Sequence, residues 1–197
     1  MSRTTTPFTA ALAALVLSVV TAPASAHPGH ELPGAGFVAG FLHPLLGFDH
    51  LLAMIAVGVW AAQLGGRARL LVPTAFVTVM CLGAASALAG FTPPHVEAGI
   101  AASLLVLGLF VTAAGRLPVT AAMALTATFA FCHGAAHGSE LPAFASPLLF
   151  GAGFVLATAL LHGAGLGIGY AARRKGQWLA RAAGLLTMAG GLAYAFA

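Results

Sequence analysis

The stretch His43-Pro44-Leu45-Leu46-Gly47-Phe48-Asp49-His50 places two imidazoles and a carboxylate inside a long apolar run. That run, residues 36–63, is long enough to cross a bilayer, which needs about 20 predominantly apolar residues. A central Asp costs about 3 kcal/mol on insertion scales, so ionisable groups at such depth usually serve a function. The stretch therefore predicts a membrane helix and, within it, a functional site.

The overall composition is that of an integral membrane protein. Of the residues, 60% are hydrophobic and only 6% are charged, against roughly 25% charged residues in an ordinary soluble domain. Mean hydropathy is +0.99, and the sequence pI of about 9.8 comes from a few Lys and Arg residues. These lie in short loops, where they act as topology determinants. No basic patch is interleaved with aromatic residues, which excludes nucleic-acid binding.

The first 26 residues have the pattern of a secretory signal peptide. A single early arginine gives the positive start, residues 8–20 form an apolar run too short to span comfortably, and Ala24-Ser25-Ala26 is a small-residue cleavage motif. Cleavage leaves a mature chain, residues 27–197, that begins with His27 and His30 on the exported side. An uncleaved seventh span is the alternative interpretation of this segment.

Six membrane spans are predicted in the single domain of the mature chain. Apolar stretches of spanning length cover residues 36–63, 70–91, 96–115, 118–138, 146–170 and 179–196. Every Lys and Arg of the mature chain lies in or beside alternate loops, after the first, third and fifth of these stretches. By the positive-inside tendency those loops face the cytoplasm, so both mature termini lie on the exported side of a bacterial cytoplasmic membrane. The predicted fold class is an all-α membrane protein with six transmembrane helices.

A second cluster, Cys132-His133-Gly134-Ala135-Ala136-His137-Gly138-Ser139-Glu140, lies at the end of the fourth predicted span. On a continued helix, His133, His137 and Glu140 fall on one face, which is ligand spacing. A zinc-protease helix has the same His pair but needs Glu directly after the first His, where this chain has Gly134. Spans one and four run in opposite directions, so the halves are interpreted as inverted three-helix repeats with the site between them.

The first cluster is expected at a break in its helix. Pro44 cannot donate a hydrogen bond to the carbonyl of Gly40, and Gly47 follows, so the helix should kink or unwind there and swing Asp49 toward the histidines. Such donors suit Ni²⁺, Zn²⁺, Cu²⁺ or Fe²⁺. The predicted metal ligands are His43, Asp49, His50, His133, His137 and Glu140.

Five further side chains are weaker candidates for metal binding: His27, His30, His95, Glu97 and His162. For His162 the alternative is an interhelical hydrogen bond, and for His95 it is a solvated position at an outer helix end. Cys132 is interpreted as a packed thiol rather than a soft ligand. Glycines at small-xxx-small spacing predict close helix packing at 36/40, 134/138, 163/167 and 165/169.

Both clusters, behind a signal peptide that ends before a His-rich start, resemble the HupE/UreJ family. The resemblance covers essentially the whole mature chain. It implies a secondary permease for nickel, in some members cobalt, that serves hydrogenase or urease maturation, with the metallochaperones of that maturation as partners. It also implies that the six predicted ligands are the functional positions. The first motif is similar as well to the His-x4-Asp-His signature of the larger nickel/cobalt transporter family, although its spacer here is five residues.

The leading interpretation is a permease, not an enzyme, that takes up Ni²⁺ from the exported side. The exposed candidates His27, His30, His95 and Glu97 would capture the ion before it passes between spans one and four. The chain has no Gly-x4-Gly-Lys-[Ser/Thr] motif, so it does not itself use ATP, and no permanently bound cofactor is expected. The alternatives are a Co²⁺ permease and an intramembrane metal-binding enzyme or redox protein.

Overall fold

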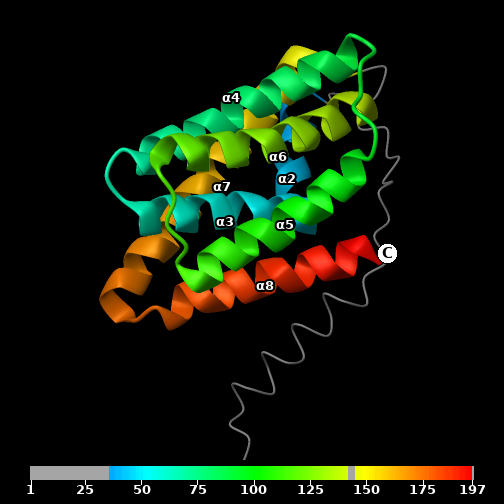
Figure 1. Ribbon diagram of the computed structural model, residues 1–197. Coiled ribbons are helices and arrows are strands. Elements are labelled where there is room, and N and C mark those ends of the chain that lie inside the picture. The colour runs from blue at the N-terminus through cyan, green and yellow to red at the C-terminus, as the bar shows by residue number, and fades with distance from the viewer. Residues whose placement is uncertain (1–35, 142–144, 197) are drawn as a thin grey trace, which may run out of the picture. The chain divides into compact units, whose positions relative to one another are not determined.

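The described part of the chain is built from helices joined by short turns (Figure 1). This part of the computed structural model comprises residues 36–141 and 145–196. Its seven helices are α2 (Phe37–Leu46), α3 (Phe48–Leu64), α4 (Ala68–Leu88), α5 (Val96–Ala113), α6 (Val119–Glu140), α7 (Pro147–Lys175) and α8 (Trp178–Ala195). The predicted signal peptide and the candidates His27 and His30 lie outside the described residues.

The helices follow the predicted spans to within a few residues at most ends. Four of them, α4 to α7, are long and apolar enough to cross a membrane, and α2 with α3 forms a fifth candidate that is bent by 80°. The last helix, α8, has 18 residues and carries Arg181 near its start, which lowers its hydropathy. The fold is therefore all-α with four or five candidate spans, and the sixth span stays a prediction.

Large apolar side chains cover the outside of these helices. Leu148, Leu46 and Leu70 are 85%, 72% and 71% exposed. A soluble monomer rarely exposes a contiguous apolar surface of this kind, whereas acyl chains are a suitable environment for it. The outer surface therefore agrees with a multi-pass membrane protein.

Glycines allow close approach where helices pack in pairs. The main pairs are α4 with α6, α3 with α7 and α5 with α8. A Cβ added at Gly134 would lie 1.9 Å from the carbonyl oxygen of Met80, so α6 contacts α4 backbone to backbone there. The prediction of close packing is wrong for Gly163 and Gly167, where an added Cβ would meet nothing within 4 Å.

The basic residues gather near one end of the helices. Trp60, near the end of α3, donates to the carbonyl of Gly115 after α5 over 2.8 Å. Arg69 at the start of α4 lies over the ring of Tyr170, late in α7, 5.1 Å from its centroid. Figure 1 shows the turns after α3, α5 and α7 toward this end, and the α4–α5 turn and the end of α8 toward the other. The predicted alternation of basic and non-basic turns is thus built into the fold.

Candidate metal centre

A break at Gly47 divides the first apolar segment into two helices. Helix α2 contains Pro44 and ends one residue before Gly47, which has φ −79° and ψ 110°, and α3 begins one residue after it. The amide of Gly47 still donates to the carbonyl of His43 over 3.0 Å. The two helices meet at 80°, which confirms the predicted kink and places His43 and His50 on different helices.

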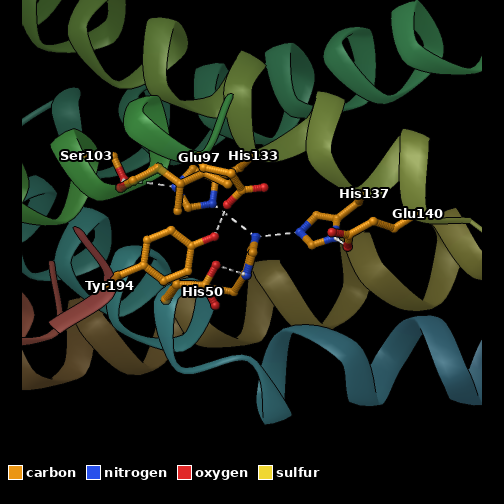
Figure 2. Close-up of polar contacts among 9 residues, drawn as sticks. His50, Glu97, Ser103, His133, His137, Glu140 and Tyr194 are labelled. Atoms are coloured by element: carbon orange, nitrogen blue, oxygen red, sulfur yellow. Dashed lines mark hydrogen bonds and ion pairs between the residues drawn. The ribbon is translucent and has the colours of Figure 1, made fainter. Parts of the chain in front are cut away.

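Three imidazoles from α3 and α6 converge at this break. The Nε2 atom of His50 lies 3.0 Å from Nδ1 of His133 and also contacts Nε2 of His137, as Figure 2 shows. All three side chains are buried, with 4%, 0% and 7% of their surface exposed. The i, i+4 spacing on α6 therefore presents both of its rings to a single nitrogen of His50.

Hydrogen bonds on the far side of two rings determine which nitrogens carry a proton. The hydroxyl of Ser103 donates its one proton to the carbonyl of Ile100 over 2.6 Å. Toward His133 its oxygen therefore accepts, so Nε2 of that ring, 2.9 Å away, is the protonated nitrogen. Likewise Nδ1 of His50 donates to the Asp49 carboxylate over 2.8 Å. In the neutral rings, Nδ1 of His133 and Nε2 of His50 are then bare lone pairs that face each other.

This arrangement of bare nitrogens suits a bound cation. Two lone pairs repel unless a proton or a metal ion lies between them. Two imidazole nitrogens that each lie about 2.1 Å from one divalent ion at an octahedral angle of about 90° are roughly 3 Å apart, and His50 and His133 present nitrogens 3.0 Å apart. Metal-binding histidines typically donate their second N–H to a carboxylate or another acceptor, as both of these rings do.

The donor atoms form two neighbouring groups, each with its atoms within 4.8 Å of one another: Asp49, His50 and His133, here the buried group, and His43, His137 and Glu140, here the open group. The open group has more contact with the surroundings, because the Glu140 side chain is 51% exposed. Its Oε2 lies 3.8 Å from Nδ1 of His137. All six residues predicted as ligands are thus brought together at one place.

Three phenylalanine rings line this place, and that of Phe150 on α7 lies 5.8 Å from His43 between centroids. The ring of Phe154 on α7 lies 4.6 Å from His137, 5.9 Å from His43 and 6.2 Å from His50, measured between centroids. The ring of Phe76 on α4 lies 5.9 Å from His133. An apolar surround of this kind controls solvent access to a metal site. Helices α2, α3 and α6 therefore supply the donors, while α4 and α7 supply apolar cover.

The weaker candidates among the described residues, His95, Glu97 and His162, lie outside both groups. His95 is exposed and precedes α5 with a left-handed φ of 59°. Glu97, in the first turn of α5, accepts a hydrogen bond from the hydroxyl of Tyr194 on α8 (Figure 2). His162 is buried, but neither ring nitrogen has a hydrogen-bond partner among the described residues, so the expected interhelical hydrogen bond is not found there. The thiol of Cys132 packs against α5, in agreement with a packed thiol.

Sequence reasoning missed Ser103, Phe76 and Phe154. A hydroxyl in the middle of an apolar span was a signal that Ser103 has a partner, because buried polar groups are normally hydrogen-bonded. The two phenylalanines carry no such signal, since an apolar residue in an apolar span is unremarkable until the fold places it against a histidine.

Fold and site together define a helical membrane protein with a buried, histidine-rich site suited to a divalent ion. The model of a family described as HupE / UreJ protein matches residues 15–194, and the chain belongs to this family. The chain is 43% identical over 179 residues to Protein HupE of Rhizobium leguminosarum bv. viciae. The matched region covers 89% of this chain and 90% of that protein. No solved structure matches the chain significantly.

Proposed function

We propose that this chain is a secondary permease that carries Ni²⁺ into the cell and supplies a nickel enzyme such as hydrogenase or urease. Membership of the HupE/UreJ family, which is permease-like, points to nickel- or cobalt-related transport rather than to catalysis. The observation that carries the proposal is the convergence of His50, His133 and His137, in which bare nitrogens of His50 and His133 face each other. Neutral imidazole is a ligand that suits Ni²⁺.

The two donor groups support a stepwise path for the ion. The open group, with the half-exposed Glu140, is the first contact, and the carboxylate offsets part of the ion's charge. The buried group follows, and His50 joins the two because one of its nitrogens faces both His133 and His137. An ion exchanges one imidazole at a time between these groups, so it is never without ligands in the apolar interior.

The proposal includes a signal peptide that is cleaved before His27 and six spans in the mature chain. Helices α2 and α3 together form the first span, and α8 forms the last. The basic turns face the cytoplasm, and both mature termini lie on the exported side. The donor groups then lie toward the exported side, because α6 ends there at Glu140. A reporter that works only in the cytoplasm should be active when it is fused after Gly176 and inactive when it is fused after Phe91. A reporter that works only on the exported side should give the opposite result. If both reporters give the reverse pattern, the orientation is reversed.

The helix pairs support the two inverted repeats. An inverted repeat exchanges the first span with the fourth, the second with the fifth and the third with the sixth. Under this exchange the pair α4 with α6 becomes the pair α7 with α3, and α5 with α8 maps onto itself. These are the main pairs of the fold.

Uptake of labelled Ni²⁺ into proteoliposomes that contain the purified protein tests the function. We expect His133→Ala and His137→Ala to abolish uptake, because each removes one of the converging nitrogens. The matched control is Thr187→Val, which alters a buried polar side chain of α8 whose hydroxyl donates to a carbonyl of its own helix. Normal uptake by folded His133→Ala protein would refute the assignment of the site.

Competition decides between Ni²⁺ and Co²⁺, since the affinities of a given site for these ions are neighbours in the divalent series. Excess unlabelled Co²⁺, Zn²⁺ and Mn²⁺ are each added to the same uptake assay. Weak inhibition by all three supports nickel, whereas inhibition by Co²⁺ equal to or stronger than that by Ni²⁺ favours a cobalt permease. Stoichiometric metal that does not exchange in the purified protein would contradict transport altogether.

A further inference from the structure

His162 on α7 is a buried histidine that the donor groups do not use. Its exposed surface is 2%, and neither Nδ1 nor Nε2 has a hydrogen-bond partner among the described residues. More than nine in ten buried polar groups in proteins have a partner. Because no hydrogen bond fixes the position of its single N–H proton, the neutral ring can present either nitrogen to a ligand.

The hydroxyl of Thr158, one turn earlier on α7, is also buried and without a partner among the described residues. Helical threonines usually satisfy this group locally, by donating to the carbonyl four residues before. In this fold Thr126 and Thr187 do so, each over 2.9 Å. Thr158 departs from that pattern, and it does so next to His162.

These two residues continue a line that begins at the metal centre. Phe154, which contacts three histidines of the centre, Thr158 and His162 are four residues apart and share one stripe of α7. The eight residues from the first to the last correspond to about 12 Å along the helix. The ring of Phe76 lies 5.9 Å from His133 and 5.3 Å from His162, so one aromatic ring links the buried group to His162. Beyond His162, α7 continues toward the basic end of the fold.

We propose that His162 and Thr158 form an inner stopping point for the divalent ion on its way from the buried group to the cytoplasm. His162 supplies one nitrogen ligand, and the Thr158 hydroxyl holds a water that the ion keeps. This inference rests on the transport function proposed above. A site with a single protein nitrogen binds more weakly than the converging imidazoles, which suits release of the ion rather than capture.

The test compares binding and transport on the same preparations of the full chain in lipid. Equilibrium dialysis with Ni²⁺ measures binding, and uptake into proteoliposomes with labelled Ni²⁺ measures transport. We expect His162→Asn to keep Ni²⁺ affinity at the converging histidines within about twofold and to lower uptake by about tenfold or more. Thr158→Val should lower uptake by about fivefold, the size of one hydrogen bond. The matched control Thr126→Val, equally buried but locally satisfied, should leave uptake unchanged.

A second binding measurement does not depend on transport. In His133→Ala protein the remaining donors of the two groups still bind Ni²⁺, and the inner site adds a weak component that the additional change His162→Asn should remove. Equal Ni²⁺ binding by His133→Ala and by the double variant overturns the inner site.

The remaining outcomes are equally decisive. Uptake by His162→Asn within about twofold of wild type overturns the proposal, as does a parallel fall in binding and uptake, because His162 would then only support the metal centre. Should His162→Asn not fold, equal uptake by Thr158→Val and Thr126→Val overturns it. If the wild-type chain does not transport Ni²⁺, the proposed function is refuted and this inference with it. If His133→Ala loses uptake while His162→Asn and Thr158→Val keep it, only the inference is refuted.

Discussion

Ser103 is expected to control the metal centre without touching the ion. Its hydroxyl accepts from Nε2 of His133, and both side chains are fully buried. In Ser103→Ala the N–H loses its acceptor, at a cost of about 1–3 kcal/mol for an unsatisfied buried donor. The ring can avoid that cost by moving its proton to Nδ1, but it then presents an N–H instead of a lone pair to His50. Either outcome weakens metal binding, and we expect affinity to fall about 10–100-fold.

A double-mutant cycle in reconstituted protein tests this mechanism. Ni²⁺ affinity is measured by competition with a chelator for wild type, Ser103→Ala, His133→Ala and the double variant. Since Ser103 acts through His133, its removal should have no further effect in the His133→Ala background. An expected loss of 10–100-fold corresponds to roughly 1.4–2.7 kcal/mol, well above the error of such a titration. Unchanged affinity in folded Ser103→Ala protein, or equal losses in both backgrounds, would refute the role assigned to this hydroxyl.

Two further predictions concern glycines. An added Cβ at Gly47 would lie 3.3 Å from Nδ1 of His50. Gly47→Ala should therefore displace that ring and lower Ni²⁺ uptake while expression stays normal. Uptake by this variant at the wild-type level would contradict the geometry of the break. Gly134→Ala should lower the thermal stability of the purified protein, because the new Cβ would meet the carbonyl of Met80 at 1.9 Å. Gly163→Ala, with nothing within 4 Å, is the matched control, and equal melting temperatures for these two variants would contradict the close packing of α4 and α6.

Most of the fold was predictable because membrane spans carry a strong local signal. Length and hydropathy located the helices, and the break in the first segment followed from Pro44 and Gly47. Packing was less predictable, because glycine spacing does not say which face of a helix meets a neighbour. Gly134 contacts α4 backbone to backbone, whereas Gly163 and Gly167 have the same spacing and face open space.

The candidate site was predictable in its residue types and not in its arrangement. Ionisable groups are so costly in a membrane that His133 and His137 stood out at once. Their shared contact with His50 depends on the 80° bend and on the position of α3 beside α6, which no spacing within either segment encodes. The role of Ser103 depends on a third helix, and that of Phe154 on a fourth.

The position of the carboxylates supports the proposed passage of an ion over permanent storage. Neutral imidazoles replace the waters of a divalent ion but leave its charge of two, which is costly in an apolar interior. Asp49 accepts from Nδ1 of His50 and therefore acts on the ion through that ring, whereas the exposed Glu140 carboxylate is itself a donor of the open group. Direct ligation by both carboxylates would neutralise the ion more completely and hold it more tightly. A carboxylate one ring away would still lower the cost of entry and leave the ion to exchangeable nitrogen ligands, a balance that suits the proposed permease.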